Sequence, residues 1–383
     1  MSGSRPARIL FVDSSGYEDL GGASTVLDEL IERVDRTRFV PALACLSPGR
    51  WPELVRARGT PAYSFPRARL RSARNLVGIV AGLAGVIRSR RIDLVHASEN
   101  TALLYATLAG RLCGTPVLWH IHSPLQPRAR SERAVAAVLR RLPPAHIVFT
   151  SEGARQRTIP FPGVAATVVP PGVDLARRAA GDGARARAAF GIPVGAPLVT
   201  MFARIEPMKG QADLVRALGT LRRTHPDVRA VLCGPPDRAS RYWARLGELV
   251  GELDLAEHLQ FPGDVRPPLK DDLVAASDVV AHPSLAESFG LAVLEAMAGG
   301  RAVVAGDTDG PRLLIEDGVD GVLVPPGDPD ALGAALARLL DHPEERAALG
   351  AAAQRSARRH DVVAMVERFE AVWDEVLAQR GPG

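Results

Sequence analysis

The sequence predicts an α/β protein built from two doubly wound domains of parallel strands and helices. Short aliphatic runs alternate with amphipathic stretches along the whole chain, which is typical of a parallel sheet with helices on its faces. The alternation is interrupted once, by an Arg/Ala/Gly-rich stretch at 176–189, and then starts again. The length of 383 residues also exceeds what one hydrophobic core usually supports, so two domains are expected.

The first domain is expected to span residues 1–180. Its sheet is predicted from short runs of aliphatic and β-branched residues, with helical patterns between most of them. The predicted strands are Arg8–Val12, Val40–Cys45, Leu94–His96, Val117–His122, His146–Thr150 and Thr167–Val169.

The second domain is expected to span residues 190–360, after a linker at 176–189. Its predicted strands are Leu198–Phe202, Ala230–Leu232, Leu259–Phe261, Val279–Ala281, Ala302–Ala305 and Gly321–Val324. The last segment, 361–383, carries a helical pattern and is predicted to cross back and pack on the first domain. In such sheets ligands bind outside the carboxyl ends of the strands, so a site is expected in the cleft between the two domains.

The composition is that of an ordinary globular protein, with 46% hydrophobic and 23% charged residues. No stretch is long enough to span a bilayer, and the apolar run ILFV at 9–12 is too short for a signal-peptide core, so a cytoplasmic location is expected. The three cysteines lie far apart in apolar segments and suggest neither disulfides nor a zinc site.

The pI near 9.3 is weak evidence for a nucleic-acid partner. Only two of the 47 basic residues are lysines, which indicates a bias towards arginine codons, and no nucleic-acid partner is expected. The distribution of charge is more informative. The first 175 residues hold 23 basic and 13 acidic residues, whereas the remainder holds 24 basic and 30 acidic residues, so the two halves are expected to meet different ligands.

The stretch MFARIEPMKG at 201–210 places two cations where a strand is predicted to end and a helix to begin. Arg204 and Lys209 would therefore lie at the carboxyl edge of the sheet. There they could bind a diphosphate and stabilise the charge that develops as a bond to it breaks. The alternative, unrelated surface charges, is weakened because Lys209 is one of two lysines in an arginine-rich chain.

The stretch ESFGLAVLEAMAGG at 287–300 follows the strand-like DVVAHPS and predicts a helix that opens near Gly290. The free N–H groups and dipole of a helix N-terminus suit a phosphate, and Gly290 lets the backbone approach closely. Glu287 and Glu295 could accept hydrogen bonds from hydroxyls at the two ends of a nucleotide sugar. Taken alone, the two glutamates are better explained as a helix cap and a surface residue.

In this order the motifs resemble the donor signature of the family-4 retaining glycosyltransferases. That family has the GT-B fold, two Rossmann-like domains facing a cleft. The signature is Arg204 and Lys209, followed by Glu287 and Glu295 eight positions apart. Four further segments resemble loops of the family, and the resemblance covers nearly the whole chain: DLGGAST at 19–25, VVPPGVD at 168–174, LCGPPD at 232–237 and LQFPGDV at 259–265.

The resemblance implies roles for individual residues. Arg204 and Lys209 would hold the diphosphate. Glu295 would bind the ribose hydroxyls, Glu287 the transferred sugar, and the backbone near Val265 the base. The remaining donor-binding residues that the family implies are Gly21 and Gly22, after the first strand, and Phe289, Gly290 and Leu291, which would line the sugar and phosphate pocket.

His122, in TPVLWHIHS, falls at the histidine that follows a strand in this family, near the transferred sugar and the acceptor. The resemblance therefore implies a catalytic role for it, together with Glu287, Arg204 and Lys209. His120 lies on the same face of the strand. The two histidines lack acidic or cysteine partners with ligand spacing, so neither a metal nor another cofactor is expected. A histidine packed at a strand end is the structural alternative.

The resemblance also implies transfer with retention of configuration from a nucleotide-diphosphate sugar. A UDP-sugar is the expected donor, and a hexose or N-acetylhexosamine the transferred group. No carboxylate pair of the kind that retaining glycosidases use is evident, so we expect same-face attack in which the leaving diphosphate helps to deprotonate the acceptor. Two departures from the family pattern are Pro170–Gly172, where PNG is common, and Leu313, where glutamate is common.

Other functions remain open at this point. A dinucleotide-dependent oxidoreductase would suit two α/β domains, but no G-x-G-x-x-G follows the first strand. A nucleotide-sugar epimerase, a pseudo-glycosyltransferase or a non-catalytic nucleotide-sugar-binding protein would share the donor site. The acceptor is open too, and a small molecule, a natural product or a glycan would each fit.

A basic segment in the first domain offers a further alternative. Arg67, Arg69, Arg71 and Arg74 precede an apolar helical pattern at 76–87. Such a helix could dock peripherally on the anionic inner face of a membrane, which would point to a lipid-linked envelope acceptor. The interpretation that we favour is a core helix with arginines at its flanks.

Overall fold

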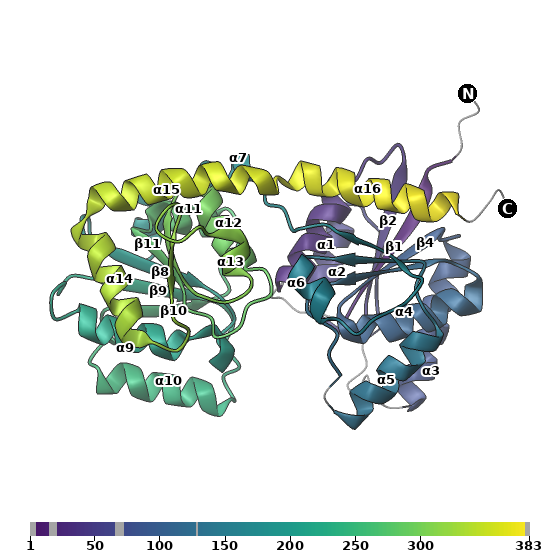
Figure 1. Cartoon of the computed structure of the whole chain (residues 1–383), viewed down its shortest axis with the longest axis horizontal. Coiled ribbons are helices and arrows are strands. Elements are labelled where there is room, and N and C mark those ends of the chain that lie inside the picture. Colours follow the sequence, from purple (N-terminus) through teal and green to yellow (C-terminus); the bar gives the residue numbers. More distant parts are fainter. Residues whose placement is uncertain (1–4, 15–20, 66–72, 128, 380–383) are drawn as a thin grey trace. The chain divides into compact units, whose positions relative to one another are not determined.

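The computed structural model describes residues 5–14, 21–65, 73–127 and 129–379. The chain divides into two compact units (Figure 1). The first unit comprises Met1–Gly172 and Val363–Gly383, and the second comprises Val173–Val362. Each unit is a Rossmann-like arrangement of parallel strands and helices, as the sequence predicts.

The sheet of the first unit has, within the described ranges, seven parallel strands in the order β3-β2-β1-β4-β5-β6-β7. The order reverses between β1 and β4, so their carboxyl ends form a topological switch point. The sequence does not predict β3, because this edge strand has three residues and the last is exposed. The strands are β1 (Ala7–Asp13), β2 (Phe39–Cys45), β3 (Ala62–Ser64), β4 (Leu94–Ser98), β5 (Val117–Ile121), β6 (His146–Phe149) and β7 (Ala165–Val168).

The helices of the first unit bury apolar faces against this sheet. In α3, Ile79, Leu83 and Ile87 belong to the same buried cluster as strand residues, which agrees with a core helix and leaves its apolar face unavailable to a membrane. The arginines at 67, 69 and 71 lie outside the described residues. The helices are α1 (Gly22–Arg33), α2 (Trp51–Ala57), α3 (Ala73–Ser89), α4 (Asn100–Cys113), α5 (Arg130–Arg141) and α6 (Glu152–Arg157).

The last helix of the chain, α16 (Val362–Ala378), contributes to the core of this first unit (Figure 1, yellow). Its Trp373 is fully buried and packs edge-on against Phe11 and Phe39. On the same helix, Glu370 pairs with Arg38 at 2.6 Å. The core of the first unit is therefore formed by the N-terminal strands together with the C-terminal helix α16.

The sheet of the second unit has the order β10-β9-β8-β11-β12-β13 within the described residues, and all its strands are parallel. Buried clusters on both faces are formed by strand and helix residues. Its switch point lies between β8 and β11. The strands are β8 (Leu198–Phe202), β9 (Arg229–Cys233), β10 (Leu259–Gly263), β11 (Val279–His282), β12 (Ala302–Gly306) and β13 (Val322–Val324).

Helices surround this sheet as well, and two of them occupy the stretch that the sequence suggests is a linker. That prediction is wrong, because residues 176–189 fall almost entirely within the helices α7 and α8. The helices are α7 (Leu175–Ala179), α8 (Gly183–Ala189), α9 (Gln211–Leu221), α10 (Arg241–Glu252), α11 (Leu269–Ala276), α12 (Leu291–Ala298), α13 (Pro311–Leu314), α14 (Pro329–Asp341) and α15 (Pro343–Ala357). None of the helices in the described ranges is long and apolar enough to cross a membrane.

The two ends of the second unit lie side by side. Val173 forms a parallel bridge with Asp361. The backbone N–H of Val173 donates to the carbonyl of His360 at 2.9 Å, and the N–H of Val362 donates to the carbonyl of Val173 at 3.1 Å. The chain therefore enters and leaves this unit at one place.

Candidate functional site

The loop after β8 carries two of the predicted site residues towards the end of β11. Gly210 ends this loop with φ of 77°, and a Cβ there would lie 2.1 Å from the carbonyl oxygen of Pro283. Only glycine accommodates both the left-handed backbone and this close approach. The side chain of Gln211 donates to the carbonyl of Arg204 at 2.7 Å. These contacts hold the loop against the segment that follows β11, on either side of the switch point.

Lys209 and Glu287 meet at this switch point. Nζ of Lys209 lies 2.8 Å from Oε2 of Glu287, and Nε2 of His282 lies 3.2 Å from the same oxygen. The other carboxylate oxygen accepts from the backbone N–H of Ser288 at 3.0 Å. Both side chains of the Lys209–Glu287 pair are largely buried. The structure thus joins two residues that the sequence links only through a family resemblance.

The surroundings of Glu287 keep it ionised. Burial opposes ionisation, but the hydrogen bonds and charges of His282 and Lys209 outweigh it and hold the pKa of Glu287 well below its ordinary value. An ionised carboxylate can only accept hydrogen bonds. Glu287 is therefore suited to accept from hydroxyl groups and unsuited to donate a proton.

His282 is a member of this cluster that sequence reasoning does not single out. It is the last residue of β11 and is buried, and its Nε2 also lies 3.1 Å from Oγ of Ser284. The sequence signal that could identify it is a histidine at the carboxyl end of a predicted strand, five residues before Glu287. Because the rest of this strand is apolar, His282 resembles a core residue in the sequence.

Arg204 is not part of the Lys209–Glu287 contact. Its side chain is 61% exposed, and its guanidinium pairs with Glu206 of the same loop at 3.3 Å. An exposed pair of this kind contributes little to stability. The side chain of Arg204 is therefore accessible at the edge of the sheet.

The segment between Glu287 and α12 has the predicted form. Gly290 precedes the helix with φ of 91°, and α12 begins at Leu291. The side chain of Phe289 is buried in the core, so its backbone is the part that could line the sugar and phosphate pocket expected at residues 289–291. A Cβ on Gly310 would lie 2.6 Å from the backbone nitrogen of Phe289, so a glycine there lets the two loops pack closely. Val265, after β10, is partly buried against the same core.

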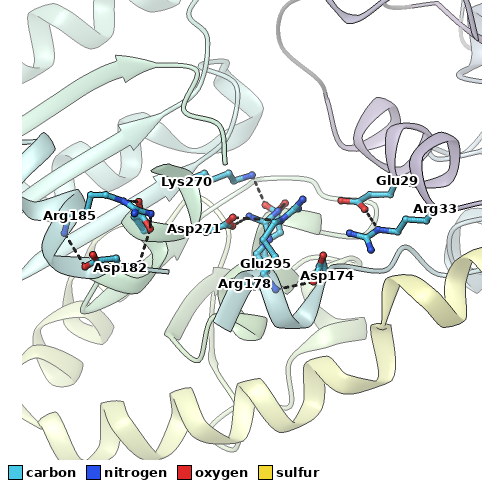
Figure 2. A network of polar contacts seen from close by, with 11 residues as sticks. Glu29, Arg33, Asp174, Arg178, Asp182, Arg185, Lys270, Asp271 and Glu295 are labelled. Carbon is cyan, nitrogen blue, oxygen red and sulfur yellow. Dashed lines mark hydrogen bonds and ion pairs between the residues drawn. The ribbon is translucent and has the colours of Figure 1, made fainter. Parts of the chain in front are cut away.

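Glu295 lies in a buried ionic network rather than at the surface (Figure 2). It is 3% exposed, and its two oxygens pair with Arg178 and with Lys270, whose Nζ is 2.6 Å away. Arg178, also 3% exposed, pairs in addition with Asp271. Burial opposes ionisation of Glu295, but the charges of Arg178 and Lys270 prevail and lower its pKa.

Arg178 and Lys270 are absent from the sequence-based site. Arg178 lies on α7, in the stretch whose arginine content predicts solvent exposure. Asp174 caps this helix by accepting from the backbone N–H of Arg177 at 2.9 Å, and α7 lies next to α11 and α12. The burial of Arg178 depends on carboxylates more than 90 positions away in the sequence, so no local pattern predicts it.

The predicted residues of the first unit lie at the carboxyl edge of its own sheet. His122 follows β5, and its Nε2 lies 3.0 Å from Oγ of Ser98 at the end of β4. Burial lowers the pKa of His122 to about 3, so its ring is neutral. Gly21 and Gly22 begin α1 after β1, and the residues at 15–20 before them lie outside the described ranges.

The described residues contain no group of three or more His, Cys, Asp or Glu side chains that could hold a metal ion. The rings of His120 and His122 contact each other at a tilt of 37°, with centroids 3.9 Å apart. Their polar contacts are made with His96 and Ser98.

Comparisons with known protein families cover both units. The model described as Glycosyl transferases group 1 matches residues 183–356, and the model described as Glycosyltransferase Family 4 matches residues 20–177. A D-inositol 3-phosphate glycosyltransferase of Thermobispora bispora is 30% identical over 407 residues, covering 96% of this chain and 92% of that protein. A protein of the same name from Acidothermus cellulolyticus is 36% identical over 218 residues, 56% of this chain, and the match spans about half of its length (48%).

Solved structures give the same fold. The Anabaena protein Alr3699/HepE, crystallised with UDP and glucose, superposes with a TM-score of 0.85 at 26% identity, covering 96% of this chain and all of that one. A sucrose-phosphate synthase from Thermosynechococcus elongatus superposes with a TM-score of 0.81 at 20% identity, covering 97% of this chain and 100% of that one. The second likeness concerns the fold alone.

Proposed function

This chain belongs to glycosyltransferase family 4, and we propose that it transfers a hexose or N-acetylhexosamine from a nucleotide-diphosphate sugar, with retention of configuration, to a hydroxyl group. The observation that carries the proposal is the cluster of Lys209, Glu287 and His282 at the switch point of the second unit. This is where open α/β sheets bind nucleotides. A cation that can bind a diphosphate lies here next to an ionised carboxylate that can accept hydrogen bonds from sugar hydroxyls, and a nucleotide-diphosphate sugar carries both groups.

The proposed donor is a UDP-sugar. Support comes from the Anabaena neighbour, whose structures contain UDP, UDP with glucose, or UDP-glucose. We assign Arg204 and Lys209 to the diphosphate and Glu287 to sugar hydroxyls. Glu295 is assigned to the ribose, which requires its oxygens to accept from ribose hydroxyls in addition to Arg178 and Lys270. The remaining proposed contacts are the backbone near Val265 for the base, and Gly21, Gly22, Phe289, Gly290 and Leu291 for the sugar and phosphates.

The mechanism follows from the charges. As the bond between the anomeric carbon and the diphosphate oxygen breaks, negative charge develops on the diphosphate, where Lys209, Arg204 and the start of α12 can stabilise it. Glu287 remains ionised, so it orients the sugar through its accepting oxygens and leaves proton transfer to other groups. The acceptor hydroxyl attacks from the same face, and its proton passes to the departing diphosphate. No metal is required in this scheme.

The proposed acceptor is a small polar molecule that carries negative charge, such as a cyclitol or sugar phosphate. Two curated relatives are named for D-inositol 3-phosphate, and the first 175 residues hold 23 basic against 13 acidic residues. The alternatives are a natural product or glycan acceptor, and a lipid-linked envelope acceptor reached from the membrane surface.

A donor-hydrolysis screen over UDP-, GDP- and dTDP-sugars tests the donor. We expect UDP release from one UDP-sugar above the background of a Lys209→Ala variant. Inositol 3-phosphate and inositol then form a matched acceptor pair, and the phosphorylated member is expected to stimulate UDP release more. If no UDP-sugar is cleaved with either acceptor, the proposed pairing of a UDP-sugar with a phosphorylated small-molecule acceptor is wrong.

The same purified protein can be tested for nucleotide-sugar epimerase activity. Incubation with donor alone, followed by analysis of the sugar, detects a nucleotide-sugar epimerase through an isomerised product. Transfer to the phosphate acceptor without isomerisation is the outcome that the proposal expects.

A further inference from the structure

Three histidines form a contiguous group at the carboxyl ends of β4 and β5. Nε2 of His96 lies 3.2 Å from Nδ1 of His120, and the ring of His120 contacts that of His122 at a tilt of 37°, with centroids 3.9 Å apart. His96 and His120 are fully buried. The family resemblance implies a role for His122 alone, so the arrangement of the other two requires its own explanation.

Trp373 on α16 sets the direction of the hydrogen bonds in this group. Its indole Nε1–H can only donate, and it meets Nδ1 of His96 at 3.3 Å. Nδ1 of His96 must therefore be the unprotonated nitrogen. Neutral His96 then carries its proton on Nε2 and donates it to Nδ1 of His120, so neutral His120 carries its proton on Nε2 as well.

Burial keeps the rings neutral, as this chain of donors requires. Burial first, and the neighbouring His122 second, lower the pKa of His96 to about 3 and that of His120 well below its ordinary value. The charged groups on the elements that pack around the rings include Asp13 on β1 and Glu370 and Asp374 on α16. The two on α16 are paired with Arg38.

The chain of donors ends at His120. Its Nε2 is buried and has no hydrogen-bond partner among the described residues. The ring lies between Phe369, at 4.8 Å between centroids, and His122. A buried donor without an acceptor is costly, and a ring kept in this state indicates that its position serves another purpose.

We propose that Trp373 is a positioning residue for His122. Its N–H fixes the tautomers of His96 and His120, and the fixed His120 ring packs directly against the ring of His122, whose Nε2 lies 3.0 Å from Oγ of Ser98. The helix α16 thereby sets the geometry of a histidine that directly follows β5 and lies about 250 positions earlier in the sequence.

This inference rests on the proposed function for its catalytic consequence. His122 orders the acceptor hydroxyl as a neutral ring and does not take its proton. The acceptor oxygen bonds to the anomeric carbon while the bond to the diphosphate oxygen breaks, and the hydroxyl proton passes to the diphosphate. Displacement of a positioned ring is expected to slow transfer and leave donor binding unchanged.

The test uses the full chain labelled with ¹⁵N-histidine. Long-range ¹H–¹⁵N spectra distinguish the two imidazole tautomers. In the wild-type protein we expect His96 and His120 as single Nε2–H tautomers. In Trp373→Phe, which keeps an aromatic ring but removes the donor, we expect His96 to lose its single tautomer. We also expect kcat to fall about 10-fold, with the KM for the UDP-sugar within about twofold of the wild-type value.

Phe369→Leu is the matched control. Phe369 contacts the rings of His96 and His120 but donates no hydrogen bond, so its loss should lower stability and leave both tautomers in place. A wild-type spectrum with His96 protonated on Nδ1 overturns the proposal without any variant. So does a folded Trp373→Phe protein with unchanged spectra and unchanged kcat. If the expected tautomers occur in a protein that transfers no sugar, the proposed function fails and the tautomer assignment stands.

Discussion

Nζ of Lys209 lies 2.8 Å from Oε2 of Glu287, although 78 positions separate the two residues in the sequence. The predicted diphosphate ligand and the predicted sugar ligand are thus each other's counter-ion. A diphosphate that binds Lys209 must share this cation with Glu287, which places the negative charge of the donor beside the carboxylate that would orient its sugar. The pair therefore couples two binding roles that the family resemblance treats separately.

Removal of either member of this pair should abolish most turnover. We expect Lys209→Ala and Glu287→Ala each to lower kcat/KM by about 10²-fold, or about 3 kcal/mol, because one loses the stabilisation of the leaving group and the other the orientation of the sugar. Initial rates of UDP release measure this. Arg216→Ala, which removes an exposed charge on α9, is the control for general effects of charge. Near-normal rates in both variants, with folded protein, contradict the site assignment.

The low pKa of Glu287 should appear in the pH dependence of stability. A carboxylate with a lowered pKa in the folded state stabilises that state above its ordinary pKa, here 4.5, and loses this contribution as the pH falls through and below that value. In urea unfolding between pH 7 and pH 3.5, the advantage of the wild-type protein over Glu287→Gln is therefore expected to shrink as the pH falls. An advantage that stays constant or grows towards pH 3.5 contradicts the pairing.

Arg178 should be essential to the stability of the second unit. Arg178→Ala leaves Glu295 and Asp271 buried with one cation fewer, and loss of one partner from a buried pair typically costs about 3–5 kcal/mol. Urea unfolding followed by circular dichroism measures the effect. Arg245→Ala, which removes an exposed arginine paired with Glu248 on α10, is the control and should leave the midpoint unchanged. Equal unfolding midpoints for the two variants would show that the ionic network of Arg178 does not stabilise the protein.

Metal removal should leave the activity intact. The cations Arg204 and Lys209 and the start of α12 are proposed to neutralise the diphosphate, so the reaction needs no divalent ion. We expect UDP release to proceed at an unchanged rate after dialysis against EDTA. Activity that is abolished by EDTA and restored by Mg²⁺ would disprove this proposal.

The sequence predicts the two sheets well because parallel strands, covered on both faces, appear as short continuous apolar runs. The edge strand β3 escapes this rule, since its three residues are too few for such a run and the last of them is exposed. The helix opening at Leu291 is predicted because the helical spacing of apolar residues starts next to Gly290, and the structure places that glycine before the helix with a positive φ. Local chemistry therefore suffices for most elements.

Contacts between distant segments are the part that the sequence does not reveal. Arginine normally indicates solvent, so Arg178 appears as part of a linker until the fold brings Asp271 and Glu295 around it. The same holds for His96, which stands in an apolar strand and looks like a core residue, because its partner Trp373 lies 277 positions away. His282 also stands in an apolar strand, and although its partner Glu287 is only five positions away, the strand pattern alone indicates a core residue.

The insertion of Val173–Val362 between the two parts of the first unit has a consequence for biosynthesis. The ribosome releases the strands of the first unit early, but Trp373, which covers Phe11 and Phe39, emerges roughly 200 residues after Gly172. At ~5–20 residues per second, this first sheet waits on the order of 10–40 s for its last helix. The second unit, whose two ends bond to each other, is complete sooner. The nascent chain therefore finishes its later domain before its earlier one.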